Sequence, residues 1–416
     1  MGYAWFGRCF LLSNRRSWFI QALAGSSMGA ALQLRAASRY LSTIRADFPI
    51  VQQRTFLNNA YWHPLSVGAK EAIEAYLERK ATGSTRYSYV PAREEAKAGF
   101  AKLIHAKPSE ISFVPSATVG ENLIVAGLGG TQMKGNIVTD ALHYESSTYL
   151  YRSLQAQGHD IRFVKAREGR IELTDLDHVI DRNTRLVAVS LVSYLNGFQY
   201  DLKSLCDLAH SRGALVYVDV VQAAGAIPID VQASHVDFCA CGSHKWLMAD
   251  VGLGFLYLRE DLLDRVARVQ YGARQIASFE NHVFPYDETP DGAASWQQIP
   301  GAAGRFEVGT ISDATVAAPN YSLPYIQSIS VENIQAHAQA LVSRLRKELP
   351  RLGYPCATPA DARSPIISFV AKQPEAIARR LEQANIEAKV EQHLLRIAPS
   401  IYNDESDIDT VLSALS

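Results

Sequence analysis

Short apolar runs alternate with amphipathic segments along the chain from Asp47 onward, and this alternation constrains the fold more than any other feature. Segments such as Gly120–Leu128 and Leu202–Arg212 carry apolar residues at helical spacing between the apolar runs. Strands separated by helices form βαβ units, in which neighbouring strands are parallel. Strands are predicted at Ile111–Val114, Ile137–Thr139, Ile161–Val164, Leu186–Ser190, Leu215–Val218, Val236–Ala240 and Gly254–Leu258.

The sequence pattern changes after about residue 310, where a second unit is predicted. Its elements are helices at Leu341–Leu349 and Glu375–Ala384 and strands at Ile366–Val370 and Leu394–Ala398. We therefore predict an α/β protein with a large domain at 47–310, built on a mostly parallel seven-stranded sheet, and a smaller C-terminal α+β domain at 311–416. The N-terminal segment of the large domain could pack with the small domain.

A segment rich in Pro, Gly, Ala and Gln, Phe284–Gly304, is predicted to be a long loop. Loops of this length are uncommon in compact domains and often have a function. We expect this one to influence specificity.

The first 46 residues contain six Arg and no acidic residue, which marks them as a targeting leader. Asn14-Arg15-Arg16-Ser17-Trp18 precedes a mildly apolar run rich in Gly and Ala, which resembles a twin-arginine export signal. An Arg- and Ser-containing segment without acidic residues also resembles a mitochondrial transit peptide. We predict export to the periplasm, with mitochondrial or cytoplasmic residence as alternatives. No apolar run reaches the roughly 20 residues that a membrane span needs.

Composition excludes several classes of protein. The 41 basic and 42 acidic residues give a net charge of −1, which does not favour a nucleic-acid partner. Five Cys in 416 residues are too few for a disulfide framework. Cys239 and Cys241 lie two residues apart with no second pair, so no zinc site is predicted.

The common cofactor and nucleophile motifs are absent from the sequence. No glycine-rich dinucleotide fingerprint follows a strand, and there is no phosphate-binding Walker loop, zinc-protease helix or serine-hydrolase elbow. A nicotinamide oxidoreductase, a nucleotide hydrolase, a zinc protease and an α/β hydrolase are therefore all disfavoured.

An Asp and a Lys follow two predicted strands that could be neighbours. Asp219 ends one buried strand, and Lys245 follows the next strand, 26 residues later. Ligands of open parallel sheets bind at the carboxyl ends of the strands. A Lys amine there can form a Schiff base with the aldehyde of pyridoxal phosphate, while an Asp pairs with the protonated pyridine nitrogen. The two residues therefore indicate a pyridoxal-phosphate site.

The residues around this pair resemble the class V aminotransferase family of fold-type I pyridoxal-phosphate enzymes. The resemblance rests on Val218-Asp219-x-x-Gln222-x-x-Gly225 followed by Ser243-His244-Lys245-Trp246, and it extends from about Phe56 to the C-terminus. The family includes cysteine desulfurases, selenocysteine lyases, kynureninases and isopenicillin N epimerases. The resemblance thus implies the cofactor and an amino-acid substrate, but not one particular reaction.

The resemblance implies a role for each matching residue. Lys245, Asp219 and His143 are the expected catalytic residues: the Schiff-base lysine, the partner of the pyridine nitrogen and a ring stacked on the pyridine. The other expected cofactor contacts are Ala117, Thr118, Ser243 and His244 at the phosphate, Gln222 at the ring hydroxyl, Asn196 near the ring oxygen, and Thr310 at the phosphate of a partner subunit. The expected substrate contacts are Arg396 at the carboxylate and Asn59 with Ala60 at the mouth. The segment around Thr310 implies a homodimer with shared active sites.

Elementary chemistry supports two of these assignments independently. The segment Ser116-Ala117-Thr118 follows a predicted strand and opens a helix, where backbone N–H groups attract a phosphate. The guanidinium of Arg396 can grip a carboxylate through two parallel hydrogen bonds, which Lys cannot imitate.

The reaction itself is left open by the sequence. Transamination, epimerisation and loss of a β-substituent all begin at the amino acid's α-carbon, and the protein selects the bond that breaks. Desulfurases of the family that form a persulfide need a cysteine shortly before the carboxylate-binding Arg, and Ile386–Leu395 contains none. A transferase, an isopenicillin-N-epimerase-like enzyme and a cysteine-independent C–S lyase therefore remain as alternatives. A catalytically silent binder would be expected to have lost Lys245, Asp219 or His143, and all three are present.

Overall fold

The computed structural model describes residues 43–83, 90–281 and 294–416, so residues 1–42 of the predicted leader lie outside the described residues. The last residues of that leader belong to the folded chain. Ile44 is buried in the core, and Arg45 Nη1 lies 2.8 Å from an oxygen of Asp407. Residues 43–46 of the predicted leader therefore pack with the rest of the described chain, and the leader itself stays a prediction. No helix among the described residues is long and apolar enough to span a membrane.

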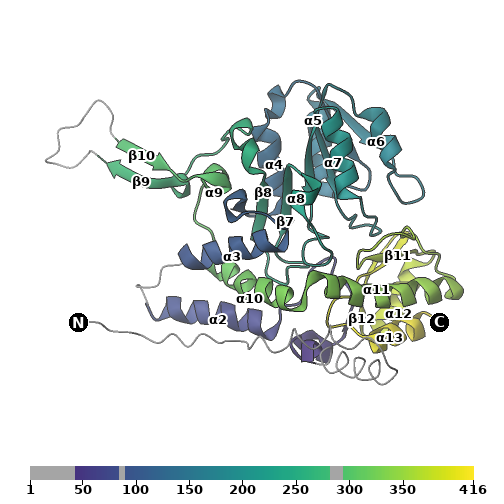
Figure 1. The fold of residues 1–416 in the computed structure, drawn as a ribbon. Coiled ribbons are helices and arrows are strands. Elements are labelled where there is room, and N and C mark those ends of the chain that lie inside the picture. Colours follow the sequence, from purple (N-terminus) through teal and green to yellow (C-terminus); the bar gives the residue numbers. More distant parts are fainter. Residues whose placement is uncertain (1–42, 84–89, 282–293) are drawn as a thin grey trace, which may run out of the picture.

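Seven strands form the central sheet, in the order β2–β8–β7–β6–β5–β3–β4 (Figure 1). Their bounds are β2 Ile111–Val114, β3 Asn136–Asp140, β4 Asp160–Val164, β5 Thr184–Ser190, β6 Leu215–Asp219, β7 Phe238–Gly242 and β8 Gly254–Leu258. Strands β4, β3, β5, β6 and β7 pair in parallel, and β8 runs antiparallel to β7 and β2. The predicted α/β fold with a mostly parallel seven-stranded sheet is confirmed.

Helices cover both faces of this sheet because its strands are apolar on both sides. Successive residues of a strand point to opposite faces, and Leu186 and Val187 of β5 accordingly belong to two different core clusters. One cluster includes α4 (Ala117–Gly127) and α5 (Glu145–Ala156). The other includes α3 (Val90–Leu103), α6 (Leu173–Val179), α7 (Leu202–Ser211) and the short α8 (Val231–Ser234).

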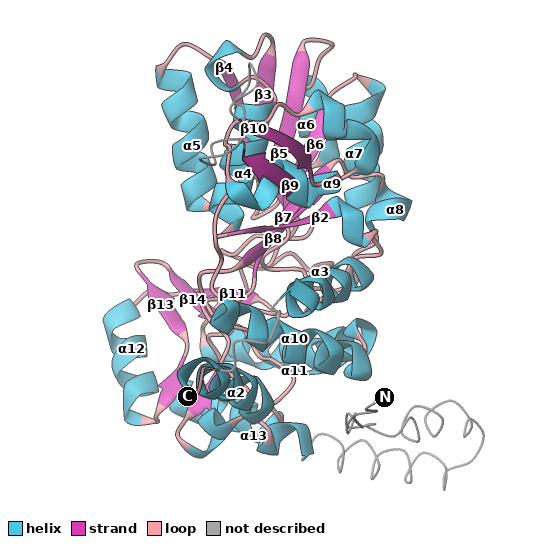
Figure 2. Ribbon diagram, turned by 90° about the vertical axis from the view of Figure 1, so that its left-hand side faces the viewer, coloured by secondary structure: helices cyan, strands magenta, loops and turns pink. Residues whose placement is uncertain are grey.

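A smaller antiparallel sheet lies near the C-terminus (Figure 2). It contains β11 (Ile367–Val370), β14 (Leu394–Ile397) and β13 (Lys389–Glu391), and it shares a core with α11 (Val331–Glu348), α12 (Pro374–Gln383) and α13 (Glu405–Leu415). Strand β1 (Thr55–Phe56) pairs in parallel with β12 (Ile386–Glu387). Leu57 is buried in the same core, so the N-terminal segment packs with the C-terminal elements.

Helix α10 (Asp313–Ile329) connects the two regions of the chain. It lies between α2 (Val67–Ala81) and α3 (Figure 1), and its Leu323 and Ile326 join the core cluster of the large sheet. Arg93 of α3 binds Asp313 through two hydrogen bonds of 2.6 and 2.8 Å. The first helix after the expected domain boundary therefore packs on helices of the large domain.

The segment predicted as one long loop, residues 284–304, contains regular structure. Strand β10 (Ala294–Gln298) pairs antiparallel with β9 (Ile276–Asn281), and α9 (Gly301–Phe306) follows. The loop prediction is wrong for residues 294–304, because a two-stranded ribbon of mixed polar residues shows little hydrophobic alternation. Residues 284–293 lie outside the described residues.

Candidate active site

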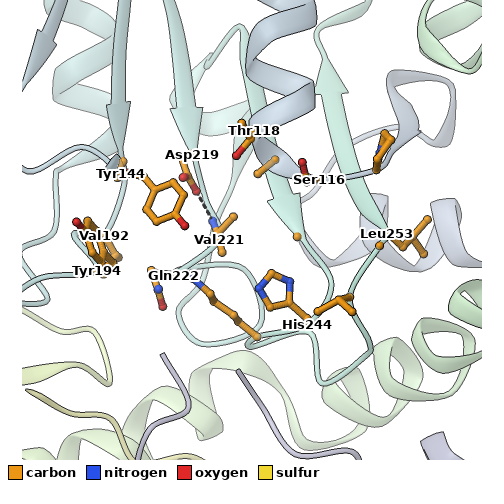
Figure 3. A pocket seen from close by; sticks show the side chains of 17 residues that line it. Ser116, Thr118, Tyr144, Val192, Tyr194, Asp219, Val221, Gln222, His244 and Leu253 are labelled. Carbon is orange, nitrogen blue, oxygen red and sulfur yellow. Dashed lines mark hydrogen bonds between the residues drawn. The ribbon is translucent and has the colours of Figure 1, made fainter. Parts of the chain in front are cut away.

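A cavity of about 260 Å³ opens at the carboxyl ends of β5, β6 and β7 (Figure 3). Asp219 is the last residue of β6, and Lys245 follows β7 by three residues, so both face the cavity from neighbouring strands. The cavity is lined by Pro115, Ser116, Ala117, Thr118, Tyr144, Ser190, Val192, Tyr194, Asp219, Val221, Gln222, Gly242, His244, Lys245, Val251, Gly252 and Leu253. The pair that the sequence singled out is therefore brought together at the sheet edge where parallel sheets bind ligands.

The Asp219 carboxylate is held within the loop that follows its strand. Its Oδ1 accepts a hydrogen bond of 2.8 Å from the backbone N–H of Val221 (Figure 3). Burial raises the pKa of Asp219, because desolvation disfavours the charged form, while His143 opposes this rise. The cavity thus presents a buried carboxyl group whose charge depends on nearby cations.

Lys245 is buried, with only 9% of its surface exposed. Its pKa is lowered to about 8, first because burial disfavours the ammonium form; Asp219 opposes this effect and Arg396 adds to it. An amine with this pKa has a substantial neutral fraction near pH 7, and only the neutral form attacks an aldehyde. The site therefore favours a nucleophilic lysine.

Helix α4 begins at the cavity wall. Ser116 is its N-cap, and the Ser116 hydroxyl accepts from the backbone N–H of Val119. Ala117 and Thr118 of the first turn line the cavity, and Thr118 Oγ1 lies 3.0 Å from Ser146 Oγ. Burial lowers the pKa of His244, also in the lining, to about 4, so its ring is neutral at pH 7. An anion here would thus be held by backbone N–H groups and hydroxyls at a helix N-terminus.

Gln222 joins the cavity to the mouth segment. Its Nε2 donates to the carbonyl oxygen of Ala60 at 2.8 Å, and its Oε1 accepts from Trp246 Nε1 at 2.8 Å. Gly225 follows in the same loop with φ of +90°, and a Cβ there would come within 2.4 Å of the Trp246 carbonyl. Glycine at this position allows the β6 loop to pack directly on the loop that carries Lys245.

Arg396 of β14 is buried beside the cavity. Its Nη1 donates to the carbonyl of Tyr194 at 2.7 Å, and its Nη2 donates to Asn58 Oδ1 at 3.2 Å. Its Nε has no hydrogen-bond partner among the described residues, and burial lowers the pKa of Arg396 to about 10. A buried guanidinium with an unpaired N–H is a suitable group for a carboxylate ligand.

Besides Thr310, three predicted cofactor contacts do not line the cavity. The His143 ring lies behind it, fully buried between Glu121 and Ser190, so the prediction that His143 stacks over the cofactor ring is not supported. Asn196 turns away because its Nδ2 donates to the Gly169 carbonyl and its Oδ1 accepts from Phe198 N–H. The Ser243 hydroxyl donates to the carbonyls of Asp250 and Leu253 and so stabilises the Lys245 loop.

The residues predicted to line the substrate mouth, Asn59 and Ala60, also lie in other surroundings than expected. Asn59 is fully buried, where its Oδ1 accepts from Tyr402 OH at 2.6 Å and its Nδ2 donates to the Ala398 carbonyl. Ala60 contributes only its carbonyl, to Gln222. Thr310 is exposed and does not line the cavity of its own chain, so its role at a partner subunit stays a prediction.

Three lining residues with polar side chains were missed by the sequence reasoning: Tyr144, Ser190 and Tyr194. Tyr144 and Tyr194 each lie within two residues of a predicted contact that faces elsewhere, His143 and Asn196. Ser190 ends β5, as Asp219 ends β6. Their position after strand ends was the available signal.

The residues present fit pyridoxal phosphate. A buried amine, a buried carboxyl group and a helix N-terminus surround one cavity, matching an aldehyde, a pyridine nitrogen and a phosphate. Together with the mostly parallel sheet, they define a fold-type I pyridoxal-phosphate enzyme. Residues 73–411 match the sequence profile of the family described as Aminotransferase class-V. The chain belongs to this family, and pyridoxal phosphate is its cofactor.

Curated relatives cover most of the chain. The cysteine desulfurase of Cronobacter sakazakii is 26% identical over 408 residues, covering 90% of this chain and 97% of its own. A probable cysteine desulfurase of Methanothermobacter thermautotrophicus is 27% identical over 310 residues, covering 73% and 74%.

Solved structures share the fold. The cysteine desulfurase of Thermococcus onnurineus matches with a TM-score of 0.78 and 23% identity, covering 89% of this chain and 96% of its own. A cystine C–S lyase in complex with its product cysteine persulfide matches with a TM-score of 0.77 and 22% identity, covering 88% and 98%.

Proposed function

We propose that this enzyme cleaves a carbon–sulfur bond of a sulfur-containing amino acid without a cysteine nucleophile. The observation that carries the proposal is that Lys245 and Asp219 share one cavity with no thiol in its lining. Relatives named cysteine desulfurase and a fold neighbour named cystine C–S lyase support sulfur chemistry. Pyridoxal phosphate, when bound, stabilises negative charge at the amino acid's α-carbon.

The residues of the chain can perform the binding and proton steps. Arg396 binds the substrate carboxylate through its unpaired Nε–H and so fixes the orientation of the α-carbon. Lys245, whose pKa is about 8, takes the α-proton as a neutral amine and returns a proton as an ammonium group. Asp219 would pair with the protonated pyridine nitrogen of the bound cofactor and keep that proton in place.

The described cysteines are poorly placed to carry a persulfide. Cys206, Cys239 and Cys241 are buried in the core, and burial raises the pKa of each. Cys356 is half-buried at an isolated bridge with Phe369, and its sulfur contacts Arg346 rather than the cavity. The turn between β13 and β14, which precedes Arg396, has no cysteine. Sulfur would therefore leave with the substrate fragment rather than on the protein.

The test supplies the holoenzyme with cysteine, cystine and alanine, one at a time, without a keto acid. The proposal expects a sulfur-containing product and pyruvate from a sulfur amino acid, and neither product from the Lys245→Ala variant. Conversion to the other enantiomer, without loss of sulfur, would establish the epimerase alternative instead. Amino-group transfer to an added keto acid would establish a transaminase, and cofactor binding without turnover a silent binder.

We also propose a homodimer in which Thr310 reaches the partner's cofactor phosphate. Support comes from its exposed position on a segment that does not line its own cavity. Mixing a Lys245→Ala chain with a Thr310→Arg chain tests this: a shared site restores part of the activity that each variant lacks alone.

We also propose export to the periplasm, supported by the twin Arg15-Arg16 pair, and cell fractionation tests it.

A further inference from the structure

A cluster of buried polar side chains lies directly behind the cavity, between α4, α5 and the sheet. At its centre is Glu121 of α4, which accepts hydrogen bonds from the hydroxyls of Ser147 and Tyr151, the latter at 2.7 Å. Its Oε1 also lies 3.1 Å from His143 Nε2. Three side chains that can donate a hydrogen bond, those of Ser147, Tyr151 and His143, therefore surround this one buried carboxyl group. A buried carboxylate needs a cationic partner.

His143 is placed to be that cation. Its Nε2 faces the Glu121 carboxyl group, and its Nδ1 lies 2.9 Å from Ser190 Oγ. The Ser190 hydroxyl can accept from an imidazolium or donate to a neutral ring, so this contact suits both forms, whereas a carboxylate at Nε2 favours the imidazolium. Burial alone would lower the pKa of His143, but Glu121, with Asp140 and Asp219, outweighs burial and raises it.

The same cluster reaches Asp219. Ser190 and Asp219 end neighbouring parallel strands, are paired in register and both line the cavity. Among the groups that favour the ionised form of Asp219, His143 has the largest effect. Lys245 also faces Asp219, but its pKa is about 8 and its amine is the group that reacts with the cofactor. His143 therefore lies, through Ser190, next to the strand end that carries Asp219.

We propose that Glu121 and His143 are positioning residues for Asp219: Glu121 keeps His143 as an imidazolium, and this cation keeps Asp219 ionised toward the cofactor's pyridine nitrogen. The inference rests on the proposed role of Asp219. It assigns His143 a place behind the sheet edge, whereas the resemblance to the family implied ring stacking. Tyr144 lines the cavity instead.

Other groups that face His143 do not supply a competing cation. The Tyr151 ring of α5 stacks at 6.2 Å between centroids, and burial raises the pKa of its hydroxyl, so it stays neutral. Tyr217 of β6, beside Glu121, is neutral for the same reason. The remaining titratable groups around the ring are acidic: Glu121 of α4, Asp140 of β3 and Asp219 of β6. A neutral His143 would leave these carboxyl groups without a positive charge behind the cavity.

Nuclear magnetic resonance of the full chain, labelled at histidine Cε1, tests the proposal with and without pyridoxal phosphate. The His143 signal is assigned by its loss in His143→Gln. We expect an imidazolium shift for His143 from pH 6 to pH 8 in the wild type. In Glu121→Gln the titration midpoint should fall by at least one pH unit, whereas Glu121→Asp, which keeps the charge, should retain an imidazolium at pH 7.

A second measurement links the cluster to the cofactor. Glu121→Gln should weaken binding of pyridoxal phosphate at least tenfold and shift the pH at which its bound absorbance changes, whereas Glu121→Asp should restore both. A neutral His143 at pH 7 in the wild type overturns the proposal, and this result needs no variant to fold. An imidazolium in a protein that leaves sulfur amino acids unchanged would instead contradict only the proposed function.

Discussion

The Lys245 Nζ lies 5.7 Å from the centroid of the Tyr144 ring, inside the same cavity. Tyr144 (Figure 3) follows β3, while Lys245 follows β7, so the two side chains approach each other across the carboxyl edge of the sheet. The aromatic wall of the cavity near the reactive amine is therefore a tyrosine, and the neighbouring His143 is buried behind it.

This relationship predicts that Tyr144 contributes to cofactor retention through its ring. Aromatic pairs contribute about 0.5–1.5 kcal/mol beyond burial, so Tyr144→Ala should weaken binding of pyridoxal phosphate by about tenfold. Tyr144→Phe keeps the ring and should bind the cofactor as the wild type does. Equilibrium dialysis with absorbance detection measures both. Equal losses in the two variants would show that the hydroxyl, and not the ring, makes the contact.

The amine of Lys245 should react with aldehydes at an unusually low pH. With its pKa near 8 rather than 10.5, its neutral fraction at pH 7 is about 300 times that of an ordinary lysine. The rate at which pyridoxal phosphate enters the cofactor-free chain should therefore rise with pH and level off above about pH 8. Stopped-flow absorbance measures this profile, and a rate still rising steeply at pH 10 would contradict it.

The charged residues beside Lys245 give matched controls for the pH dependence of this rate. Asp219 stabilises the ammonium form and Arg396 destabilises it. Asp219→Asn should therefore move the inflection to lower pH, and Arg396→Met should move it to higher pH. Shifts in the same direction for both variants would mean that lost structure, and not charge, dominates.

The central sheet was predictable from sequence because parallel strands buried on both faces are near-continuous apolar runs. The same strand ends made Asp219 and Lys245 predictable, since each directly follows its strand. Which of two adjacent residues enters the cavity was not predictable. Asp140 Oδ1 accepts from Leu142 N–H and shapes the turn that directs Tyr144 inward and His143 backward. Likewise, Asn59 pairs with Tyr402, which lies 343 residues away in the sequence.

Asn196 and Tyr194 separate a structural from a functional role in the same turn. Asn196→Ala removes hydrogen bonds to Gly169 and Phe198, so we expect a loss of stability of about 1–3 kcal/mol with cofactor affinity unchanged. Tyr194→Ala should alter substrate affinity, because its ring lines the cavity. Thermal unfolding and steady-state kinetics on both variants check this, and a loss of cofactor affinity in Asn196→Ala alone would reverse the assignment.

Arg396 should be needed as an arginine and not merely as a positive charge. Two of its five N–H donors bind the Tyr194 carbonyl and Asn58, and its Nε–H is unpaired, which leaves donors for the substrate carboxylate. Lys cannot satisfy these partners together, so Arg396→Lys should lower kcat/KM by about a hundredfold, mainly through KM. Cofactor affinity serves as the control and should change little. An unchanged KM would place the carboxylate elsewhere.

Buried His63 should make the stability of the chain depend on pH below neutrality. Its Nδ1 faces the Pro64 carbonyl, which can only accept, so Nδ1 carries the proton and Nε2 accepts from the Ser400 hydroxyl. This arrangement uses the neutral ring. Burial accordingly lowers the pKa of His63 to about 4, against 6.5 for an unperturbed histidine.

Between these two values the unfolded chain binds a proton at His63 that the folded chain does not, so stability is present above pH 6.5 and falls as pH decreases toward 4. Its contribution to this loss between pH 7.5 and pH 5 is about 2 kcal/mol. His63→Asn should be less stable than the wild type at pH 7.5, because the ring's packing and hydrogen bonds are lost, yet lose less on acidification. Urea unfolding at pH 7.5 and at pH 5 measures the free energy of unfolding of each variant at the two pH values. Ser400→Ala keeps the buried ring and should retain the wild-type slope; an equally steep slope in His63→Asn would assign the pH dependence to other groups.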